Sequence, residues 1–171
     1  MKKFIIGIIS YAKNPDRVKN ALKLFNQLKD YPKLIIAQGY KPKKTNNEDI
    51  IIYEQKALGI CNARKRLQEE FMNTDYTHIL LLDDDITIYK FFDNHGEITN
   101  YNYIAQDNFT LNNCVLSREV IKKIPFEENL IPAEDYNYRK KIDKYFVREN
   151  CKLLFFILQN HTNSTWRKNN G

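Results

Sequence analysis

Cysteine is scarce in this chain of 171 residues, which has three: Cys61, Cys114 and Cys151. Their wide spacing, without a CxxC pair, argues against a disulfide framework and a zinc knuckle, so we expect a reducing, cytoplasmic location. Long apolar runs are also missing, and no stretch approaches the ~20 residues of a membrane-spanning helix. The opening apolar run at residues 4–9 is too short for a signal peptide and is interpreted as a first core strand.

Glycine and proline are infrequent, with five of each. The chain has no Pro/Gly-rich linker, internal repeat or low-complexity segment that would divide it. Hydrophobic residues make up 43% of the sequence, which is enough for a packed core. The length prior then predicts one domain over residues 1–167, followed by a flexible polar tail at 168–171.

The charge is unbalanced towards the basic side, with a formal net charge of +6 and a pI of about 9.1. Such a balance permits an acidic partner, but solvated lysines on helix faces account for most basic chains. Aromatic residues interleaved with lysines, as in residues 89–92 and 136–145, keep a non-catalytic nucleic-acid-binding module open as an alternative.

Strand and helix patterns alternate along the chain. Buried or alternating apolar runs predict strands at residues 4–9, 34–37, 50–53, 78–82, 86–89, 113–116 and 152–158. Helical spacing of apolar residues predicts helices at about 14–28, 57–72, 118–124 and 134–146, the last with Tyr138, Ile142 and Tyr145 facing inward. Residues 91–109 look irregular. This alternation predicts an α/β domain with a mainly parallel central sheet and helices on both faces.

Three consecutive carboxylates, Asp83, Asp84 and Asp85, follow the apolar run 79–82. Strand geometry places Asp83 and Asp85 on one side and Asp84 on the other. Ligands of open α/β sheets gather at the carboxyl ends of strands, and clustered carboxylates repel one another unless a cation neutralises them. Oxygen ligands favour Mg²⁺ or Mn²⁺. The alternative is a polar loop that only ends the strand.

Two later features extend this acidic pattern. Glu134 and Asp135 open a helix, where acidic residues also simply complement the helix dipole. His161 stands beyond the last apolar strand, and a lone histidine is more often structural than a ligand. Each of these features indicates a functional site only in combination with the others.

Taken together, the set resembles the GT-A fold nucleotide-sugar glycosyltransferases, especially their family 2-like branch, from about residue 4 to residue 166. Four segments carry the resemblance: 9–17 as the opening strand and nucleotide-binding turn, 59–64 as the helix start, 82–85 as the DxD motif, and 133–135 as the acidic motif of the acceptor-side helix. Arg139 occupies the usual basic place after the acidic motif. His161 falls where the family often has a C-terminal histidine.

The resemblance implies a divalent cation, Mn²⁺ or Mg²⁺, held by Asp83, Asp85 and His161. It also implies a site for a nucleoside diphosphate sugar, with Tyr11 stacking on the nucleobase and Arg64 contacting base or phosphate. The full set of implied donor-binding residues is Ser10, Tyr11, Arg64, Asp83 and Asp84.

In the same resemblance, Asp135, with Glu134 beside it, is the catalytic group that deprotonates the acceptor hydroxyl, which implies a single displacement with inversion. The acceptor stays open; the basic charge suggests a polyanionic one, such as a glycan, another polymer or modified nucleic acid. Acceptor recognition falls to residues 91–109 or to another subunit of a homo-oligomer.

Two departures from the family pattern stand out. Gln38 occupies the neighbourhood in which the family usually has an acid that holds the base edge, and the chain is short for the family. A nucleotidyltransferase of related fold is a further alternative, but it would need a Gly-rich loop after the first strand, and residues 10–14 contain no glycine. A degenerate, inactive member of the family is disfavoured by the intact motif set.

Overall fold

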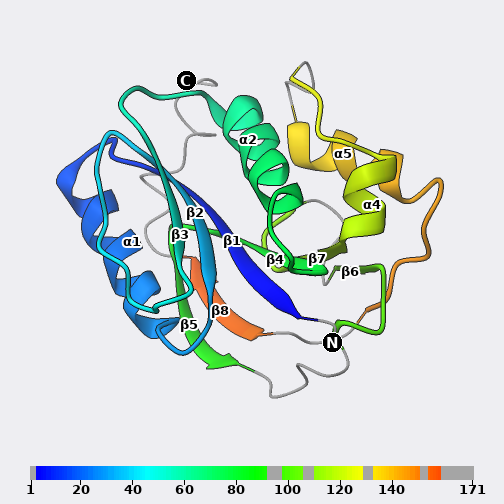
Figure 1. The fold of residues 1–171 in the computed structure, drawn as a ribbon, viewed down its shortest axis with the longest axis horizontal. Coiled ribbons are helices and arrows are strands. Elements are labelled where there is room, and N and C mark those ends of the chain that lie inside the picture. Colours follow the sequence, from blue (N-terminus) through cyan, green and yellow to red (C-terminus); the bar gives the residue numbers. More distant parts are fainter. Residues whose placement is uncertain (1–2, 92–97, 106–109, 129–132, 151–153, 159–171) are drawn as a thin grey trace.

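The computed structural model describes residues 3–91, 98–105, 110–128, 133–150 and 154–158, which form an α/β fold (Figure 1). Its strands are β1 (Phe4–Tyr11), β2 (Lys33–Gln38), β3 (Ile50–Glu54), β4 (His78–Asp83), β5 (Ile86–Phe91), β6 (Tyr103–Ala105), β7 (Cys114–Ser117) and β8 (Leu154–Leu158). Its helices are α1 (Pro15–Gln27), α2 (Ile60–Met72), α4 (Arg118–Lys123) and α5 (Glu134–Ile142).

The main sheet has six strands in the order β3-β2-β1-β4-β7-β6. β3, β2, β1 and β4 run parallel, whereas β7 is antiparallel to both β4 and β6. β5 and β8 form a separate antiparallel pair. The carboxyl ends of β1, β2 and β4 therefore lie at one edge of the sheet, and polar residues that follow these strands meet there.

Helices cover both faces of the sheet. On one face, α1 packs Ala21, Leu24 and Phe25 against alternate residues of β1, β2 and β4. On the other face, α2, α4 and α5 share a second hydrophobic cluster with the remaining residues of the same strands. Gly7 of β1 belongs to this close packing, because a Cβ there would lie 2.5 Å from Ile79 Cδ1.

Local sequence explains how α1 and α2 begin. Asn14 caps α1 through its side chain, which accepts a hydrogen bond from Arg17 N at 2.9 Å, and Pro15 follows in the first turn. α2 begins instead after Gly59, whose φ of +79° and ψ of 162° lie in a region that only glycine adopts readily.

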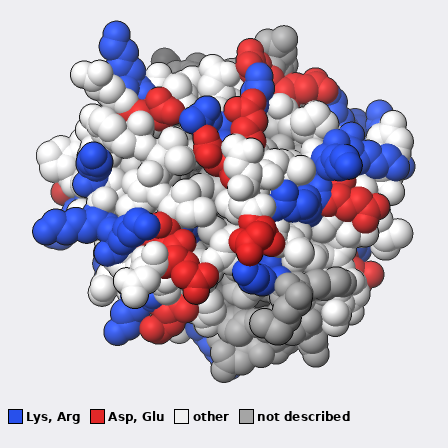
Figure 2. Space-filling model, viewed as in Figure 1, with Lys and Arg blue, Asp and Glu red and all other residues white. Residues whose placement is uncertain are grey.

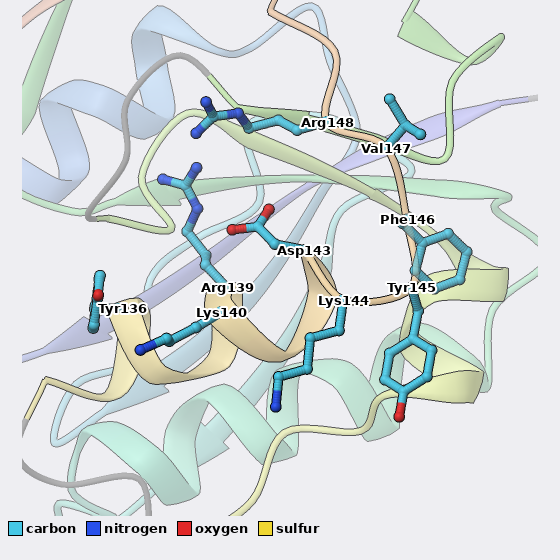
Figure 3. Close-up of a pocket in the computed structure, with 9 residues that line it drawn as sticks. All are labelled: Tyr136, Arg139, Lys140, Asp143, Lys144, Tyr145, Phe146, Val147 and Arg148. Carbon is cyan, nitrogen blue, oxygen red and sulfur yellow. The ribbon is translucent and has the colours of Figure 1, made fainter.

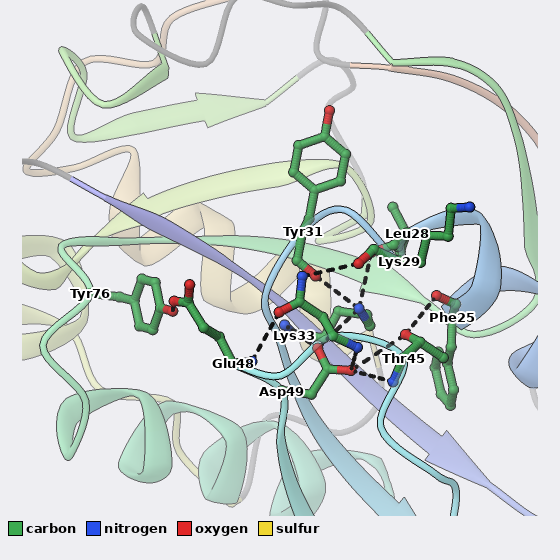
Figure 4. A network of polar contacts seen from close by, with 10 residues as sticks. Phe25, Leu28, Lys29, Tyr31, Lys33, Thr45, Glu48, Asp49 and Tyr76 are labelled. Atoms are coloured by element: carbon green, nitrogen blue, oxygen red, sulfur yellow. Dashed lines mark hydrogen bonds and ion pairs between the residues drawn. The ribbon is translucent and has the colours of Figure 1, made fainter.

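A buried ion pair lies away from the carboxyl edge, at the start of β2 (Figure 4). Lys33 and Asp49 are both almost fully buried, with Nζ and Oδ1 3.0 Å apart. Lys33 Nζ also donates to the carbonyls of Leu28 and Tyr31. Asp49 accepts from the backbone N–H groups of Lys33, Thr45 and Asn46. The pair thus fastens the long β2–β3 loop to the end of α1.

The architecture confirms the predicted α/β domain with a mainly parallel sheet and helices on both faces. β6 lies inside the stretch expected to be irregular and completes the sheet beside β7. α5 ends at Ile142, four residues before the predicted end. The expectation that Tyr145 faces inward is wrong, because it follows the helix and 61% of it is exposed. Tyr138 and Ile142 are buried as predicted.

Cys61 and Cys114 are buried, and Cys151 lies outside the described residues, as does the expected tail at 168–171. Within the described part of the chain, no helix has the length and apolar character to cross a membrane.

Candidate active site

The candidate site lies where β1 and β4 end side by side. Ile9 pairs with Asp83 in the strand register, so the chain leaves the sheet at Ser10 and Tyr11 on one strand and at Asp84 and Asp85 on the other. β1 continues through α1 to β2 on one side, while β4 lies on the other side of β1. This reversal of strand order at the carboxyl edge marks the usual ligand position in such sheets.

Asp84 is buried on the α1 side of the sheet. Ser10 Oγ donates to its Oδ2 at 2.6 Å, and Arg17 Nη2 pairs with its Oδ1 at 2.8 Å. Tyr40 OH lies 2.7 Å from Ser10 Oγ, and because the Ser10 proton points to Asp84, the Tyr40 hydroxyl donates to Ser10. Ser10 and Asp84, both predicted to bind the donor, therefore lie in a buried network that joins β1, α1 and β4.

Asp83 faces the opposite side of the sheet, as strand alternation predicts, and meets Arg64 of α2. Arg64 Nη2 lies 3.5 Å from Asp83 Oδ1. The same guanidinium group pairs with Asp135: Nη2 donates to Oδ2 at 3.1 Å, and Nε lies 2.9 Å from Oδ1 without the geometry of a hydrogen bond. Arg64 is only 5% exposed, so it is not a solvated helix residue.

Asp135 reaches this position from the first turn of α5. Ala133, the residue before the helix, has a φ of +63° and a ψ of 48°, a left-handed conformation that costs a non-glycine residue ~1–2 kcal/mol. The strained residue turns the chain so that Glu134 is buried and Asp135 points to Arg64. Strain of this kind is typical of functional sites.

A short loop before β7 contacts both acidic motifs. Leu111 N donates to Asp135 Oδ2 at 3.0 Å, and Asn112 Oδ1 accepts from Asp83 N at 3.0 Å. Asn113, with a φ of +59°, donates from its backbone to the Leu81 carbonyl. The loop 111–113 therefore fixes Asp83 and Asp135 relative to each other.

Negative charge is in excess at this edge. Burial is the main cause that raises the pKa of Asp83 to about 7; Arg64 opposes the rise, and the carboxylates of Asp135, Asp85 and Asp84 add to it. Burial, with Asp135 beside it, also raises the pKa of Glu134. Two guanidinium groups, Arg17 and Arg64, thus face five carboxyl groups across the motifs 83–85 and 134–135. A further cation would stabilise this arrangement.

The remaining predicted residues take varied positions. Tyr11 ends β1 with 36% of its surface exposed, at the same edge. Gln38 is buried; its amide donates to the Ser10 carbonyl at 3.4 Å and accepts from Leu58 N at 2.8 Å. Arg139 is buried beneath α5, where it donates to Tyr103 OH and to the Thr110 carbonyl.

The structure describes only two of the three residues predicted to bind the metal ion. Asp83 and Asp85 lie at the carboxyl edge, whereas His161 lies outside the described residues. Among the side chains that the structure describes, no group of three or more His, Cys, Asp or Glu residues is placed to hold a metal ion. The oxygen donors and surplus negative charge at 83–85 are nevertheless of the kind that Mg²⁺ or Mn²⁺ binds.

An open pocket of about 690 Å³ lies along α5 and the segment that follows it. Figure 3 shows side chains of both signs here, with the Arg139 and Arg148 guanidinium groups and the Asp143 carboxylate pointing into the same region. Exposed basic, aromatic and apolar side chains line the rest: Tyr136, Lys140, Lys144, Tyr145 and Val147. Lys123 Nζ lies 4.9 Å from the centre of the Tyr145 ring.

The wider surface does not present one basic face in the view of Figure 2. Acidic and basic side chains are interspersed there. Several surface charges are paired, such as Lys65 with Glu128 and, within α2, Arg66 with Glu70. On this face the net positive charge is thus dispersed, which gives a nucleic-acid backbone no continuous track.

No model of a protein family matches the chain, and no curated protein matches it. Solved structures do match it. S. aureus TarS superimposes with a TM-score of 0.64 at 12% sequence identity, covering 92% of this chain and 37% of TarS. The chain shares its fold with this part of TarS. It spans 60% and 58% of TarS 1–349 as solved with UDP and with UDP-GlcNAc, at 13% and 14% identity and TM-scores of 0.64 and 0.63.

Two smaller proteins share this fold over most of their own length. A197 from STIV matches with a TM-score of 0.57 at 13% identity, covering 92% of this chain and 94% of A197. A protein described as a nucleotide-diphospho-sugar transferase, from Desulfovibrio desulfuricans G20, matches with a TM-score of 0.56 at 9% identity, covering 88% and 80% of the two chains. Identities this low establish the fold alone.

Three residues that contribute to the site were not predicted from the sequence. Arg17 balances Asp84, and the signal for it was its place in the first turn of a helix that starts at the carboxyl edge. Tyr40 and Asn112 reach the site through loops, and nothing in their spacing distinguishes them from the chain's many other tyrosines and asparagines.

Proposed function

We propose that the protein is a metal-dependent glycosyltransferase that moves a sugar from a nucleoside diphosphate sugar to an acceptor hydroxyl with inversion. The observation that carries the proposal is the convergence of three segments distant in sequence: Asp83 at the end of β4, Arg64 on α2 and Asp135 at the start of α5. The shared fold with glycosyltransferase domains supports the reaction class. Membership of the family 2-like branch is part of the proposal.

The donor would bind at the carboxyl edge between β1 and β4. Tyr11 is placed with part of its surface exposed there and would stack on the nucleobase. Arg64 would bind the diphosphate, because a guanidinium group presents a fork of N–H donors that matches phosphate oxygens. Ser10 and Asp84 would shape this pocket through Arg17 and Tyr40 rather than by pointing into it.

A divalent cation, Mn²⁺ or Mg²⁺, would be held by Asp83 and Asp85, with His161 as the proposed further ligand. The surplus of carboxylates over guanidinium groups at this edge fits such an ion. When bound, it would act as a Lewis acid that stabilises the negative charge of the leaving diphosphate.

Asp135 would act as the general base. The acceptor oxygen attacks the anomeric carbon of the sugar, and the bond from that carbon to the phosphate oxygen breaks as the diphosphate leaves. Asp135 takes the hydroxyl proton as the new bond forms. Leu111 N orients its carboxylate from behind, and Glu134 supports the same turn of α5.

The acceptor would approach from the side of α5. The pocket along this helix begins at Tyr136, next to Asp135, and its exposed lysines suit an anionic glycan or similar polymer. We propose such a polyanionic acceptor as the substrate of this domain. Replacing Lys140 and Lys144 by Glu should raise the KM for the anionic polymer, whereas replacing Lys19 and Lys23 of α1 by Glu makes the same charge change away from the pocket and should not.

The decisive experiment for donor binding is a thermal-shift series with Mn²⁺ and UDP, GDP, CDP or ADP in turn. A ligand that binds only the folded protein stabilises it by ~2.7 kcal/mol at a hundredfold excess over its Kd. At least one diphosphate should raise the Tm in a metal-dependent manner, and Asp85→Ala should abolish the effect. If none of the four nucleotides shifts the Tm, the proposed function is wrong.

A second experiment identifies the donor sugar. Slow transfer to water makes hydrolysis of nucleotide sugars a readout that needs no acceptor. Asp135→Asn should bind the nucleotide but lose sugar transfer, and full transfer activity in this variant would remove Asp135 from the mechanism.

A further inference from the structure

Arg64 engages the proposed base in a way that blocks its action. Its guanidinium group lies against both carboxylate oxygens of Asp135: Nη2 donates to Oδ2 at 3.1 Å, and Nε lies 2.9 Å from Oδ1 in an ion-pair contact without hydrogen-bond geometry. Leu111 N donates to Oδ2 as well. A carboxylate paired with a buried guanidinium is a poor proton acceptor, because protonation would leave the Arg64 charge uncompensated.

The same guanidinium group already extends towards the donor side of the site. Its Nη2 lies 3.5 Å from Asp83 Oδ1, longer than either contact with Asp135. A diphosphate bound beside Asp83 would offer this group several anionic oxygens in matching geometry. Arg64 would need only a change of side-chain rotamer to exchange Asp135 for the phosphates, because α2 fixes its backbone beside both groups.

Asp135 would keep its orientation after this exchange. Leu111 N remains as a hydrogen-bond donor to Oδ2, and the left-handed Ala133 sets the direction of the helix start. The freed Oδ1 could then accept the proton of an acceptor hydroxyl. The two carboxylates on either side of Arg64 are therefore coupled through one cation.

We propose that Arg64 is a donor-released latch: it masks Asp135 in the free protein and uncovers it when the diphosphate draws the guanidinium away. The proposal rests on the proposed function, since it takes a nucleoside diphosphate as the releasing ligand. It makes Arg64 a positioning residue that couples donor binding to activation of the base.

The latch makes an unusual prediction about affinity. If Arg64 must leave Asp135 to reach the diphosphate, removing the Asp135 charge releases Arg64 in advance. Asp135→Asn should therefore bind UDP with Mg²⁺ more tightly than the unmodified protein, by about fivefold or more, the lower end of common coupling between sites. Isothermal titration calorimetry measures this Kd directly.

Two controls separate the latch from a general charge effect. Glu134→Gln removes a neighbouring negative charge without removing a group paired with Arg64, so it should change the Kd much less. In the Arg64→Gln background, the additional Asp135→Asn change should not tighten binding. The ¹⁵N resonance of Arg64 Nε offers a readout in the unmodified protein, and it should shift when Mg²⁺ and UDP are added.

The outcomes are distinct. Tightening that is specific to Asp135→Asn and dependent on Arg64 supports the latch. An unchanged Kd, or equal tightening by Glu134→Gln, overturns the latch while leaving the proposed function in place. If UDP does not bind, the series is run with GDP, CDP and ADP, and a failure of all four overturns both proposals.

Discussion

Two buried ion-pair regions of this molecule differ in how completely their charges are matched. At the start of β2, one lysine faces one aspartate, and backbone groups of two loops hydrogen-bond both (Figure 4). At the carboxyl edge, Arg17 and Arg64 face a larger set of carboxyl groups, and one guanidinium serves two of them. The first region is electrostatically complete, whereas the second has negative charge left for a ligand cation.

The difference separates stability from function within one fold. A matched buried pair costs stability when either partner is removed, because the other is left charged and without compensation. A site with surplus negative charge can gain stability when a carboxylate is neutralised. The predictions below test this contrast, beginning with the largest expected change.

Lys33→Met should give the largest loss. It leaves Asp49 buried without its cation, and breaking a buried pair in this way typically costs ~3–5 kcal/mol. Urea unfolding measures the change in the free energy of unfolding. Lys3→Met, which removes the exposed partner of Asp75, is the matched control and should leave the unfolding curve unchanged. An equally small effect of both variants would refute the idea that the pair at β2 is structural.

Asp84→Asn should cost less, about 2 kcal/mol, because Arg17 retains 15% exposure of its side chain and water can partly compensate it. The variant should still bind the donor when folded, since Asp84 contacts Ser10 and Arg17 inside the protein. Asp85→Asn should do the reverse, keeping stability and losing metal-dependent nucleotide binding. Calorimetric Tm values with and without Mn²⁺ and nucleotide distinguish the two, and identical behaviour would contradict the assignment.

Gly59→Ala should cost ~1–3 kcal/mol through the backbone alone. No atom lies within 4 Å of a Cβ built at this glycine, so crowding contributes nothing, but its φ of +79° is unfavourable for alanine. Because α2 starts here and carries Arg64, nucleotide affinity should fall together with stability. Denaturant unfolding and titration of the same sample with nucleotide provide the check. A loss of stability without a loss of nucleotide affinity would show that the start of α2 does not position the site.

Asp83→Asn should have the smallest effect, and it should be stabilising above neutral pH. The pKa of Asp83 is about 7 in the folded protein against 3.8 for an ordinary aspartate, so the folded state binds more protons between these values. Its contribution to stability is therefore present below pH 4 and is lost as the pH rises to 7. The gain from the variant should grow across that window and then level off.

Unfolding in EDTA at a series of pH values tests this sign. A third of the Asp83 side chain is exposed, so solvent limits the size of the effect. A gain that is constant with pH would show that Asp83 is not the group that titrates.

The elements that are regular in sequence could be predicted, because burial imposes a simple periodicity on them. The runs that became β1, β2, β4 and α2 are continuous or helically spaced, and tertiary packing agrees with local pattern there. β6 could not be predicted, since three residues carry too little pattern and their pairing with β7 is decided by the assembled sheet.

The candidate site likewise has residues that the sequence predicts and residues that it does not. The acidic motifs at 83–85 and 134–135 are short and local, so the sequence reveals them. Their partners are not local: Arg64 lies 71 residues from Asp135, and Leu111 and Asn112 contribute through the geometry of a loop. Strand alternation predicted that Asp83 and Asp84 face opposite sides, but which of the two sides is buried among other side chains depends on such partners.

The loop 111–113 hydrogen-bonds to both acidic motifs and to the carbonyl of Leu81, two residues before Asp83. This bracket, together with Arg64, sets the spacing of the two motifs. Redesign of sugar or polymer preference could therefore alter the outer surfaces freely, provided that this bracket keeps its length and its left-handed asparagine.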